Sequence, residues 1–164
     1  MKLELKNIKH TEWASQETYC YQASLYVNGK PVAVVSNDGH GGPDRDYAHP
    51  KSGGLGGDYR SAMSEVHAYF GALPPSPFSY EGSDGVMIHA SLPQDLESWC
   101  GDRVNDWLSS RDLKRKLKSG FLFQVADVVG LFGHKTRPSP ASGVSVVLND
   151  LPFADALAIW KGTA

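Results

Sequence analysis

The chain has 164 residues, of which 41% are hydrophobic and 21% charged, and its formal net charge is −2 at pH 7. This length suits one domain with a hydrophobic core, and the composition argues against global disorder. A net charge so close to zero excludes a whole-molecule field that would draw the protein to nucleic acid or anionic lipid, so any nucleic-acid site has to be a local patch.

Two cysteines, Cys20 and Cys100, match no recognised thiolate motif. The sequence therefore predicts free, buried thiols and neither a disulfide framework nor a zinc site. The first residues, Met-Lys-Leu-Glu-Leu-Lys, alternate charged and apolar side chains, and no run approaches the roughly 18 apolar residues that span a bilayer. We expect a cytoplasmic protein that makes no membrane contact.

The chain opens with three predicted strands. Apolar and charged residues alternate over 3–8, which indicates a half-buried edge strand, and residues 19–27 alternate between two faces of a second strand. Asn28-Gly29 follows at once, and this pair favours a type I′ turn because both central residues of that turn need positive φ. A return strand over 30–36 completes an antiparallel three-stranded meander.

Helices are predicted after the meander. Beyond Asp58, which can cap a helix, apolar residues recur at spacings of three and four and indicate a helix that packs on the sheet: Tyr59, Met63, Val66, Phe70 and Leu73. A second helical region begins at Pro93, and a slip in its apolar phase predicts a kink or a break near Ser109. Between the two, residues 78–85 are rich in turn formers, and the state of 86–90 is left open.

The last third of the chain returns to strand. Residues 121–132 favour either a hairpin that turns near Ala126-Asp127 or one longer strand, and 144–148 predicts a final strand. A short amphipathic helix from Phe153 follows. Together these elements predict a single α+β domain over residues 1–164, with an antiparallel sheet and two to three helices packed on it.

A glycine-rich stretch over 36–60 connects the third strand to the first helix and holds seven of the 17 glycines. Connections in compact domains run about 4 to 6 residues, and much longer ones are usually functional or disordered. We therefore predict a structured surface whose polar side chains face outward to a partner: His40, Asp44, Arg45, Asp46, Tyr47 and His49.

The same stretch allows chemical alternatives. Its carboxylates and imidazoles could converge on a divalent cation, although their spacing matches no metal template: Asp38, His40, Asp44, Asp46 and His49. The glycine run over 53–57 enters the N-terminus of a helix, where backbone N–H groups favour an anion such as phosphate, but Asp58 would repel it. The nucleophile elbow G-x-S-x-G is absent, so we assign no catalytic residue and expect no cofactor.

A cluster of cations surrounds Leu113 and Leu117 in the second helical region. Such cations can neutralise phosphates along one helical face, or they can remain solvated and complement the dipole at the helix C-terminus. We predict a second partner-binding patch here, able to contact nucleic acid or an acidic protein: Arg111, Lys114, Arg115 and Lys118.

Several short runs of this sequence resemble a group of small uncharacterised proteins encoded by bacteriophages and prophages. These runs are Ala-Ser-Gln-Glu-Thr at 14–18, the strand with Asn28-Gly29, Val-Ser-Asn-Asp-Gly-His-Gly-Gly at 35–42 and Leu-Asn-Asp-Leu-Pro-Phe at 148–153. The resemblance carries no known chemistry, so no catalytic residue follows from it. It implies a setting, the cytoplasm of an infected bacterial host.

These patterns lead to three functional hypotheses. The leading one is a non-catalytic binding protein that docks on a bacterial protein or nucleoprotein complex, as a phage-type, anti-CRISPR-like inhibitor of a defence complex would. The first alternative is a metal- or nucleotide-binding enzyme that uses the loop 36–60, with His40 or His49 as ligand or base. The second alternative is a DNA-binding protein that uses the basic helix 111–118.

Overall fold

The computed structural model describes residues 1–52, 57–139 and 143–163. Helices and antiparallel sheets are both present, which confirms the predicted α+β class. The chain divides into two compact units, Met1–Val104 and Asn105–Ala164. The single domain stays a prediction, because two compact units can belong to one domain. Among the described residues, no helix combines the length and the apolar character needed to cross a membrane.

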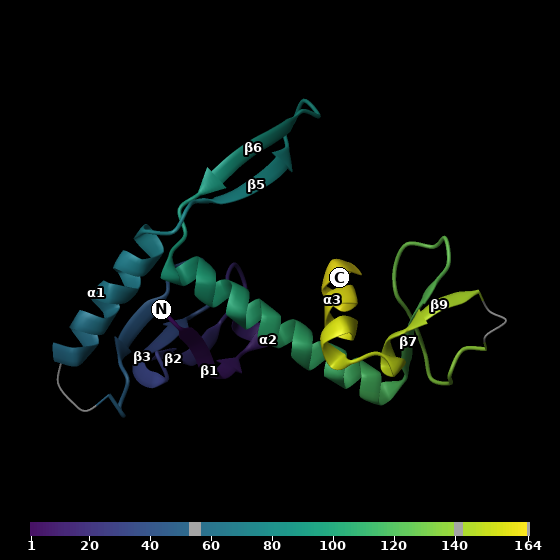
Figure 1. Ribbon diagram of the computed structural model, residues 1–164, viewed down its shortest axis with the longest axis horizontal. Helices are drawn as coiled ribbons and strands as arrows, with labels where there is room; N and C mark the ends of the chain where they lie inside the picture. Colours follow the sequence, from purple (N-terminus) through teal and green to yellow (C-terminus); the bar gives the residue numbers. More distant parts are fainter. Residues whose placement is uncertain (53–56, 140–142, 164) are drawn as a thin grey trace. The chain divides into compact units, whose positions relative to one another are not determined.

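Four antiparallel strands form the sheet of the first unit, in the order β1-β2-β3-β4 (Figure 1). Their bounds are Leu3–His10 for β1, Tyr21–Val27 for β2, Lys30–Asn37 for β3 and Arg45–Ala48 for β4. The predicted turn between β2 and β3 is confirmed, since φ is 50° at Asn28 and 82° at Gly29. The three-stranded meander is therefore present as β1 to β3.

The core of the first unit includes the central strands and helix α1 (Gly57–Gly71), which packs against β3. Leu25 of β2 and Val35 of β3 are almost completely buried, and Met63, Val66 and Phe70 of α1 are buried as well. Burying one such side chain stabilises the fold by about 1.5–3 kcal/mol. The apolar stripe predicted from the spacing of these helical residues is thus confirmed.

The stretch predicted as a loop over 36–60 contains a strand. β4 pairs with β3 from Ser36↔Arg45 to Ala33↔Ala48, so the sheet has one strand more than the meander. The physical reason is that β4 lies at the edge of the sheet and exposes most of its side chains, and its apolar pattern is therefore weak. The backbone hydrogen bonds between β4 and β3 do not depend on the side chains, so the sequence does not reveal them.

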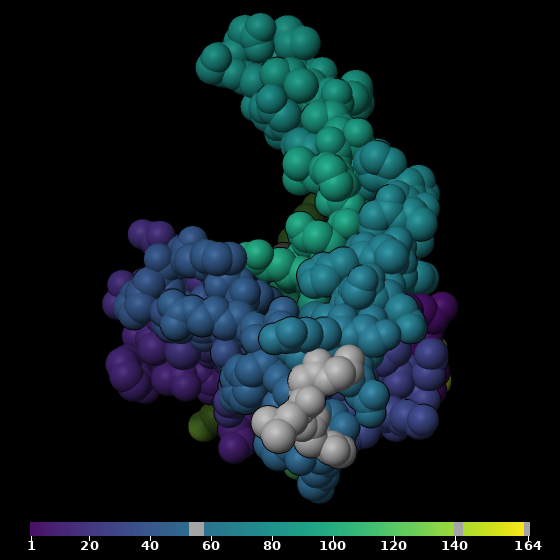
Figure 2. Space-filling model, turned by 90° about the vertical axis from the view of Figure 1, so that its left-hand side faces the viewer, coloured from purple at the N-terminus to yellow at the C-terminus, as the bar shows by residue number. Residues whose placement is uncertain are grey.

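Residues 76–92, which include the segment left open above, form a hairpin. β5 (Ser76–Glu81) pairs with β6 (Met87–Leu92), from Ser76↔Leu92 to Glu81↔Met87. In Figure 2 this hairpin (teal) extends away from the rest of its unit. Every residue of β5 is exposed, and in β6 only Ala90 is partly buried.

Helix α2 runs without a break from Leu96 to Ser119, so the predicted break near Ser109 is wrong. Its first turn is capped by Asp95, whose carboxylate accepts a hydrogen bond of 2.7 Å from the backbone N–H of Ser98. The spacing of the apolar residues changes along the helix because its two halves contribute side chains to two different hydrophobic cores. Cys100 and Val104 are buried in the first unit, whereas Leu113 belongs to the core of the second.

The second unit contains a three-stranded antiparallel sheet in the order β8-β7-β9, where β7 is Phe121–Val125, β8 Phe132–His134 and β9 Val144–Val147. The pairing of β7 with β8 confirms the hairpin alternative for 121–132, with Asp127 at a φ of 62° in the turn. The predicted C-terminal helix is α3 (Phe153–Thr163). The core cluster consists of Leu113, Leu122, Leu148 and Ala156.

Asn149 joins the end of α2 to β7. Its side-chain oxygen accepts a hydrogen bond of 3.0 Å from the N–H of Leu122, and its amide nitrogen donates to the carbonyls of Leu117 at 3.2 Å and Gly120 at 3.0 Å. Two of these partners are carbonyls at the helix C-terminus, which the helix itself leaves unbonded. One side chain therefore satisfies the helix end and fixes the start of the strand.

Replacing this amide should destabilise the second unit. We expect Asn149→Ala to lower the free energy of unfolding by about 2 kcal/mol, because three hydrogen bonds are lost at a partly buried site. Urea denaturation followed by tryptophan fluorescence measures the change. Ser145→Ala is the control, since Ser145 is exposed and makes one bond of 3.3 Å to the carbonyl of Gln124. A loss for Asn149→Ala no larger than that of the control would contradict this role.

Candidate macromolecule interface

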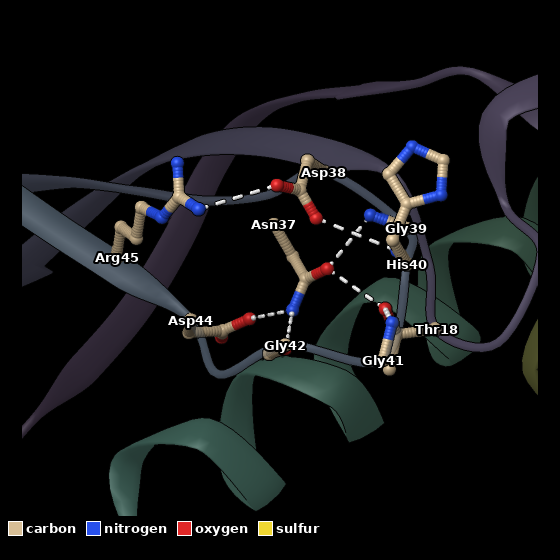
Figure 3. A network of polar contacts seen from close by, with 9 residues as sticks. All are labelled: Thr18, Asn37, Asp38, Gly39, His40, Gly41, Gly42, Asp44 and Arg45. Carbon is tan, nitrogen blue, oxygen red and sulfur yellow. Dashed lines mark hydrogen bonds and ion pairs between the residues drawn. The ribbon is translucent and has the colours of Figure 1, made fainter.

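The first part of the predicted loop is built around the side-chain amide of Asn37, at the end of β3 (Figure 3). Its oxygen accepts hydrogen bonds of 2.8 Å from the N–H of Gly39 and from the hydroxyl of Thr18. Its nitrogen donates to the carbonyl of Gly42 at 2.8 Å and to the carboxylate of Asp44 at 3.0 Å. Asn37 is buried, and all four hydrogen-bonding positions of its amide are filled.

Gly39 allows the turn to pack closely against residues 14–17. Its φ is +87°, and a Cβ atom there would lie 2.0 Å from the carbonyl oxygen of Ala14, so only glycine fits. Its own carbonyl accepts hydrogen bonds from the N–H groups of Gln16 and Glu17, each at 3.0 Å. The loop is therefore an ordered part of the fold, fixed by contacts that are remote in sequence.

The side chain of Asp44 belongs to this network. Its carboxylate accepts hydrogen bonds from Asn37 and from the hydroxyl of Tyr21. Burial raises the pKa of Asp44 above its ordinary value, against the opposing effect of these two hydrogen bonds. The carboxylate of Asp44 thus pairs with two buried residues of the sheet, Tyr21 and Asn37, and its contact with a partner stays a prediction.

Two groups next to Asp44 are held in their neutral forms. Burial raises the pKa of the Tyr21 hydroxyl, and repulsion by Cys100 in its thiolate form adds to this effect. Burial also raises the pKa of the Cys100 thiol to about 12. A pocket of ≈ 480 Å³ opens beside these residues, lined in part by Tyr21, Asn37 and Asp44. At neutral pH neither the phenol nor the thiol supplies the anionic nucleophile that covalent catalysis needs.

The remaining predicted residues of the loop divide into two groups. Asp46 accepts a hydrogen bond from the hydroxyl of Tyr59, and His49 is half-buried and accepts one of 3.1 Å from the N–H of Lys51. Tyr47 is exposed but its hydroxyl accepts a bond of 2.7 Å from Gln22. These bonds occupy polar atoms that were expected to be available to a partner.

Of the six loop residues predicted to face a partner, His40 and Arg45 agree best with that prediction. Both are exposed, and in Figure 3 the His40 ring points away from the amide network. Arg45 forms an ion pair of 3.3 Å with Asp38, and both side chains of that pair are more than half exposed. Exposed pairs of this kind are weak and can exchange for a partner's charge.

The structure gives limited support to the two alternatives in which the loop binds a metal ion or an anion. Within residues 1–52, 57–139 and 143–163, no group of three or more His, Cys, Asp or Glu side chains is arranged to hold a metal ion. The glycine run predicted to bind an anion covers 53–57, of which 53–56 lie outside the described residues.

The four predicted cations of α2 share one surface, which we call the basic face: Arg111, Lys114, Arg115 and Lys118. Their spacing of three, four and seven residues places them on one side of a helix, and together with Ser119 they line a shallow depression of ≈ 460 Å³. All four are exposed. Arg115 forms an ion pair of 3.1 Å with Asp112, while Arg111, Lys114 and Lys118 pair with no carboxylate of the described residues.

Aromatic rings support two of these cations. The Arg111 guanidinium lies 4.9 Å from the centre of the Trp107 ring, and the Lys114 ammonium lies 5.0 Å from that of Phe153. Each contact is attractive by about 0.5–1 kcal/mol at an exposed site and limits the motion of a long side chain. The charges are thus held in place before any partner binds.

The overall charge near zero hides a strong segregation between the two units. Residues 105–164 contain eight lysines and arginines against five aspartates and no glutamate. Residues 1–104 contain eight lysines and arginines against 13 acidic residues. The basic face therefore belongs to the unit that carries an excess of positive charge, and the four cations of that face account for the excess.

Sequence reasoning missed an apolar surface on the β5–β6 hairpin. Directly paired residues of antiparallel strands point to the same side, so one side carries Phe78, Tyr80, Ile88 and Leu92. Val86, whose carbonyl accepts a hydrogen bond of 2.8 Å from the N–H of Gly82, extends this side by one pair. We call these five residues the hairpin face. The missed signal was an alternation of apolar residues on both sides of the turn at Gly82 and Gly85.

The pKa of Asp44 predicts how stability changes with pH. Because the folded-state value is raised, the fold favours the protonated carboxyl, and this contribution is present below the unfolded pKa of about 3.9 and lost as pH rises through the folded value. We expect Asp44→Asn to gain stability relative to the natural protein as pH rises from about 3 to 6. Urea denaturation at each pH measures the difference, and a difference that shrinks over this range would refute the assignment.

The thiol of Cys100 should be inert in the folded protein. With a pKa of about 12, its thiolate fraction at pH 8 is about 10⁻⁴, against about a quarter for an unperturbed thiol. In a Cys20→Ser variant, where Cys100 is the sole thiol, we expect labelling by a disulfide reagent to be at least about 1000-fold slower in buffer than in denaturant. Native labelling within tenfold of the denatured rate would show that the thiol is accessible.

Comparison with known proteins adds no further assignment. Neither a family model, nor a curated protein, nor a solved structure matches this chain.

Proposed function

We propose that this protein is a non-catalytic macromolecule-binding protein whose second unit docks through the basic face on the phosphate backbone of a nucleic acid, free or within a nucleoprotein complex. The observation that supports the proposal is the arrangement of four exposed cations on one side of α2, three of them without a carboxylate partner in the described chain. Ordered cations that lack internal partners are suited to neutralise phosphates.

The spacing of the cations fits a polyanion. Lys118 follows Arg111 by seven residues, so at a rise of about 1.5 Å per residue the basic face extends over roughly 10 Å along the helix. Duplex DNA presents one negative charge per about 1.7 Å of its axis, which offers several phosphates over that length. The negative end of the helix dipole, equivalent to about half a charge, is small beside four full positive charges.

The aromatic residues favour backbone contact over base stacking. Trp107 and Phe153 already contact the Arg111 and Lys114 side chains, so a cation occupies one face of each ring and competes there with an unpaired base. We therefore propose contact with the phosphates of a duplex, with little dependence on sequence.

The resemblance to small bacteriophage proteins supports a proposal about biological setting. In the cytoplasm of an infected bacterium, a nucleoprotein defence complex would present the phosphates that the basic face requires. Inhibition of such a complex is the biological role that we propose, with the exposed His40 and Arg45 of the first unit as additional contacts. The metal- or nucleotide-binding enzyme remains the rival hypothesis for the loop.

Salt dependence tests the proposed contact. We expect the full chain to bind a fluorescein-labelled 20-base-pair duplex, with the logarithm of the binding constant falling against log [NaCl] at a slope of about −3 to −4, since each neutralised phosphate contributes about −0.9. Lys114→Ala should reduce the magnitude of this slope by about 1. Fluorescence anisotropy between 50 and 200 mM NaCl gives both quantities.

A matched control is Lys9→Ala, because Lys9 is an exposed cation on β1 of the first unit. It should leave affinity and slope unchanged. Absence of binding at 50 mM NaCl, or equal effects of the two substitutions, would overturn the proposal and favour an acidic protein as the partner of the basic face.

A further inference from the structure

The hairpin face exposes large apolar side chains that a soluble protein normally covers. Tyr80 is 48% exposed, Val86 58% and Leu92 59%, and Phe78 stacks on Tyr80 with ring centres 5.9 Å apart. The opposite side of the hairpin is mostly polar, with the Ser79 hydroxyl 2.6 Å from the His89 ring. A two-stranded hairpin is marginally stable unless its apolar side packs against something.

A cleft continues the hairpin face at its base. This cleft has a volume of ≈ 240 Å³ and lies between Phe78 and Leu92 of the hairpin and Trp99 and Asp102 of α2. Asp102 is exposed, and its side chain makes no hydrogen bond or ion pair with another described residue. The cleft therefore offers an apolar wall beside an unpaired carboxylate, which suits a side chain with an apolar stem and a positive head.

The segment of chain that carries this surface is predominantly acidic. From Ser61 to Asp102 the chain carries six acidic residues and no lysine or arginine: Glu65, Glu81, Asp84, Asp95, Glu97 and Asp102. Arg103, the first cation beyond this run, lies 5.9 Å from the Trp99 ring, so a guanidinium is compatible with the surroundings of the cleft. An apolar surface inside an acidic segment complements a partner that is both apolar and basic.

We propose that the hairpin face and the cleft at its base bind a basic polypeptide segment, in which lysine or arginine residues alternate with large apolar side chains. The apolar side chains of the segment cover Phe78, Tyr80 and Ile88, and one of its cations enters the cleft and pairs with Asp102. This site is independent of the basic face, since every residue in it belongs to the first unit.

The acidic residues near the hairpin favour a basic polypeptide over nucleic acid, anionic lipid or a second copy of the chain. Nucleic acid and anionic lipid carry negative charge, and the acidic residues on and around the hairpin would repel both. A second copy of the chain would have to place an equally acidic hairpin against this one if the contact were symmetric. A basic segment is the partner whose apolar burial and electrostatic attraction act together.

Three peptide probes test the proposal on the full chain. The first is a fluorescein-labelled 12-residue peptide of alternating lysine and valine, the second replaces each lysine by glutamate, and the third replaces each valine by serine. We expect the first to bind and the other two to bind at least tenfold more weakly, as measured by fluorescence anisotropy. Equal binding of the first two peptides, or no binding of the first, would overturn the proposal.

Adjacent residues of β6 provide a matched pair of variants. Ile88 lies on the hairpin face, whereas Met87 is paired with Glu81 and lies on the opposite side, and both are exposed. Ile88→Ser should weaken binding of the lysine–valine peptide at least tenfold, while Met87→Ser should change it less than twofold. Asp102→Asn should weaken it and reduce its dependence on salt.

The remaining outcomes identify a different occupant. Because both positions are exposed, neither variant should alter the thermal unfolding of the protein, and equal losses of binding in both variants would refute the assigned face. Self-association in sedimentation velocity that Ile88→Ser abolishes would assign the hairpin face to a second copy. Loss of duplex DNA binding in Ile88→Ser would assign it to nucleic acid, and each of these two results would overturn the proposed partner.

Discussion

The fourfold hydrogen bonding of the Asn37 amide determines what the glycine-rich segment can do. Leaving a buried amide unsatisfied costs about 1–3 kcal/mol per polar group, so the chain around it is constrained to supply Thr18, Gly39, Gly42 and Asp44 as partners. These bonds convert a segment that the sequence presents as a long loop into an ordered turn followed by β4. The polar residues of that turn are therefore largely structural.

Much of the scaffold could be predicted because its signals are local. The positive φ values required by a type I′ turn are encoded by Asn28-Gly29, and the spacing of Met63, Val66 and Phe70 encodes the buried side of α1. The parts that could not be predicted depend on distant partners. Asp44 accepts a hydrogen bond from Tyr21 of β2, and Asp46 accepts one from Tyr59 of α1. The distance in sequence between these partners follows no helix or strand period. The sequence therefore contains no sign that these two carboxylates accept internal hydrogen bonds.

The continuity of α2 illustrates a second limit of pattern reading. A change of apolar phase normally indicates a kink, but here each half of one helix contributes residues to a different core. The basic face could be predicted because cations at spacings of three and four need no tertiary partner to share a surface. Its aromatic supports could not, since Phe153 of α3 is remote in sequence from Lys114.

Segregated charge gives the molecule two surfaces of opposite chemistry. The basic face suits phosphates, whereas the hairpin face combines apolar side chains with acidic surroundings and suits a basic polypeptide. A chain whose net charge is close to zero can thus carry two strongly polarised binding surfaces, each confined to its own unit. Neither surface requires an activated nucleophile or a metal, which agrees with a binding function.

The most direct test of this account is to map amide chemical shifts of the full chain during titration with a 20-base-pair DNA duplex. We expect the largest changes at residues 111–119 and smaller ones at 38–49, because most polar groups of the loop are occupied by internal hydrogen bonds, while Arg111, Lys114 and Lys118 pair with no carboxylate of the described residues. Changes centred on 38–49, with 111–119 unaffected, would contradict the account.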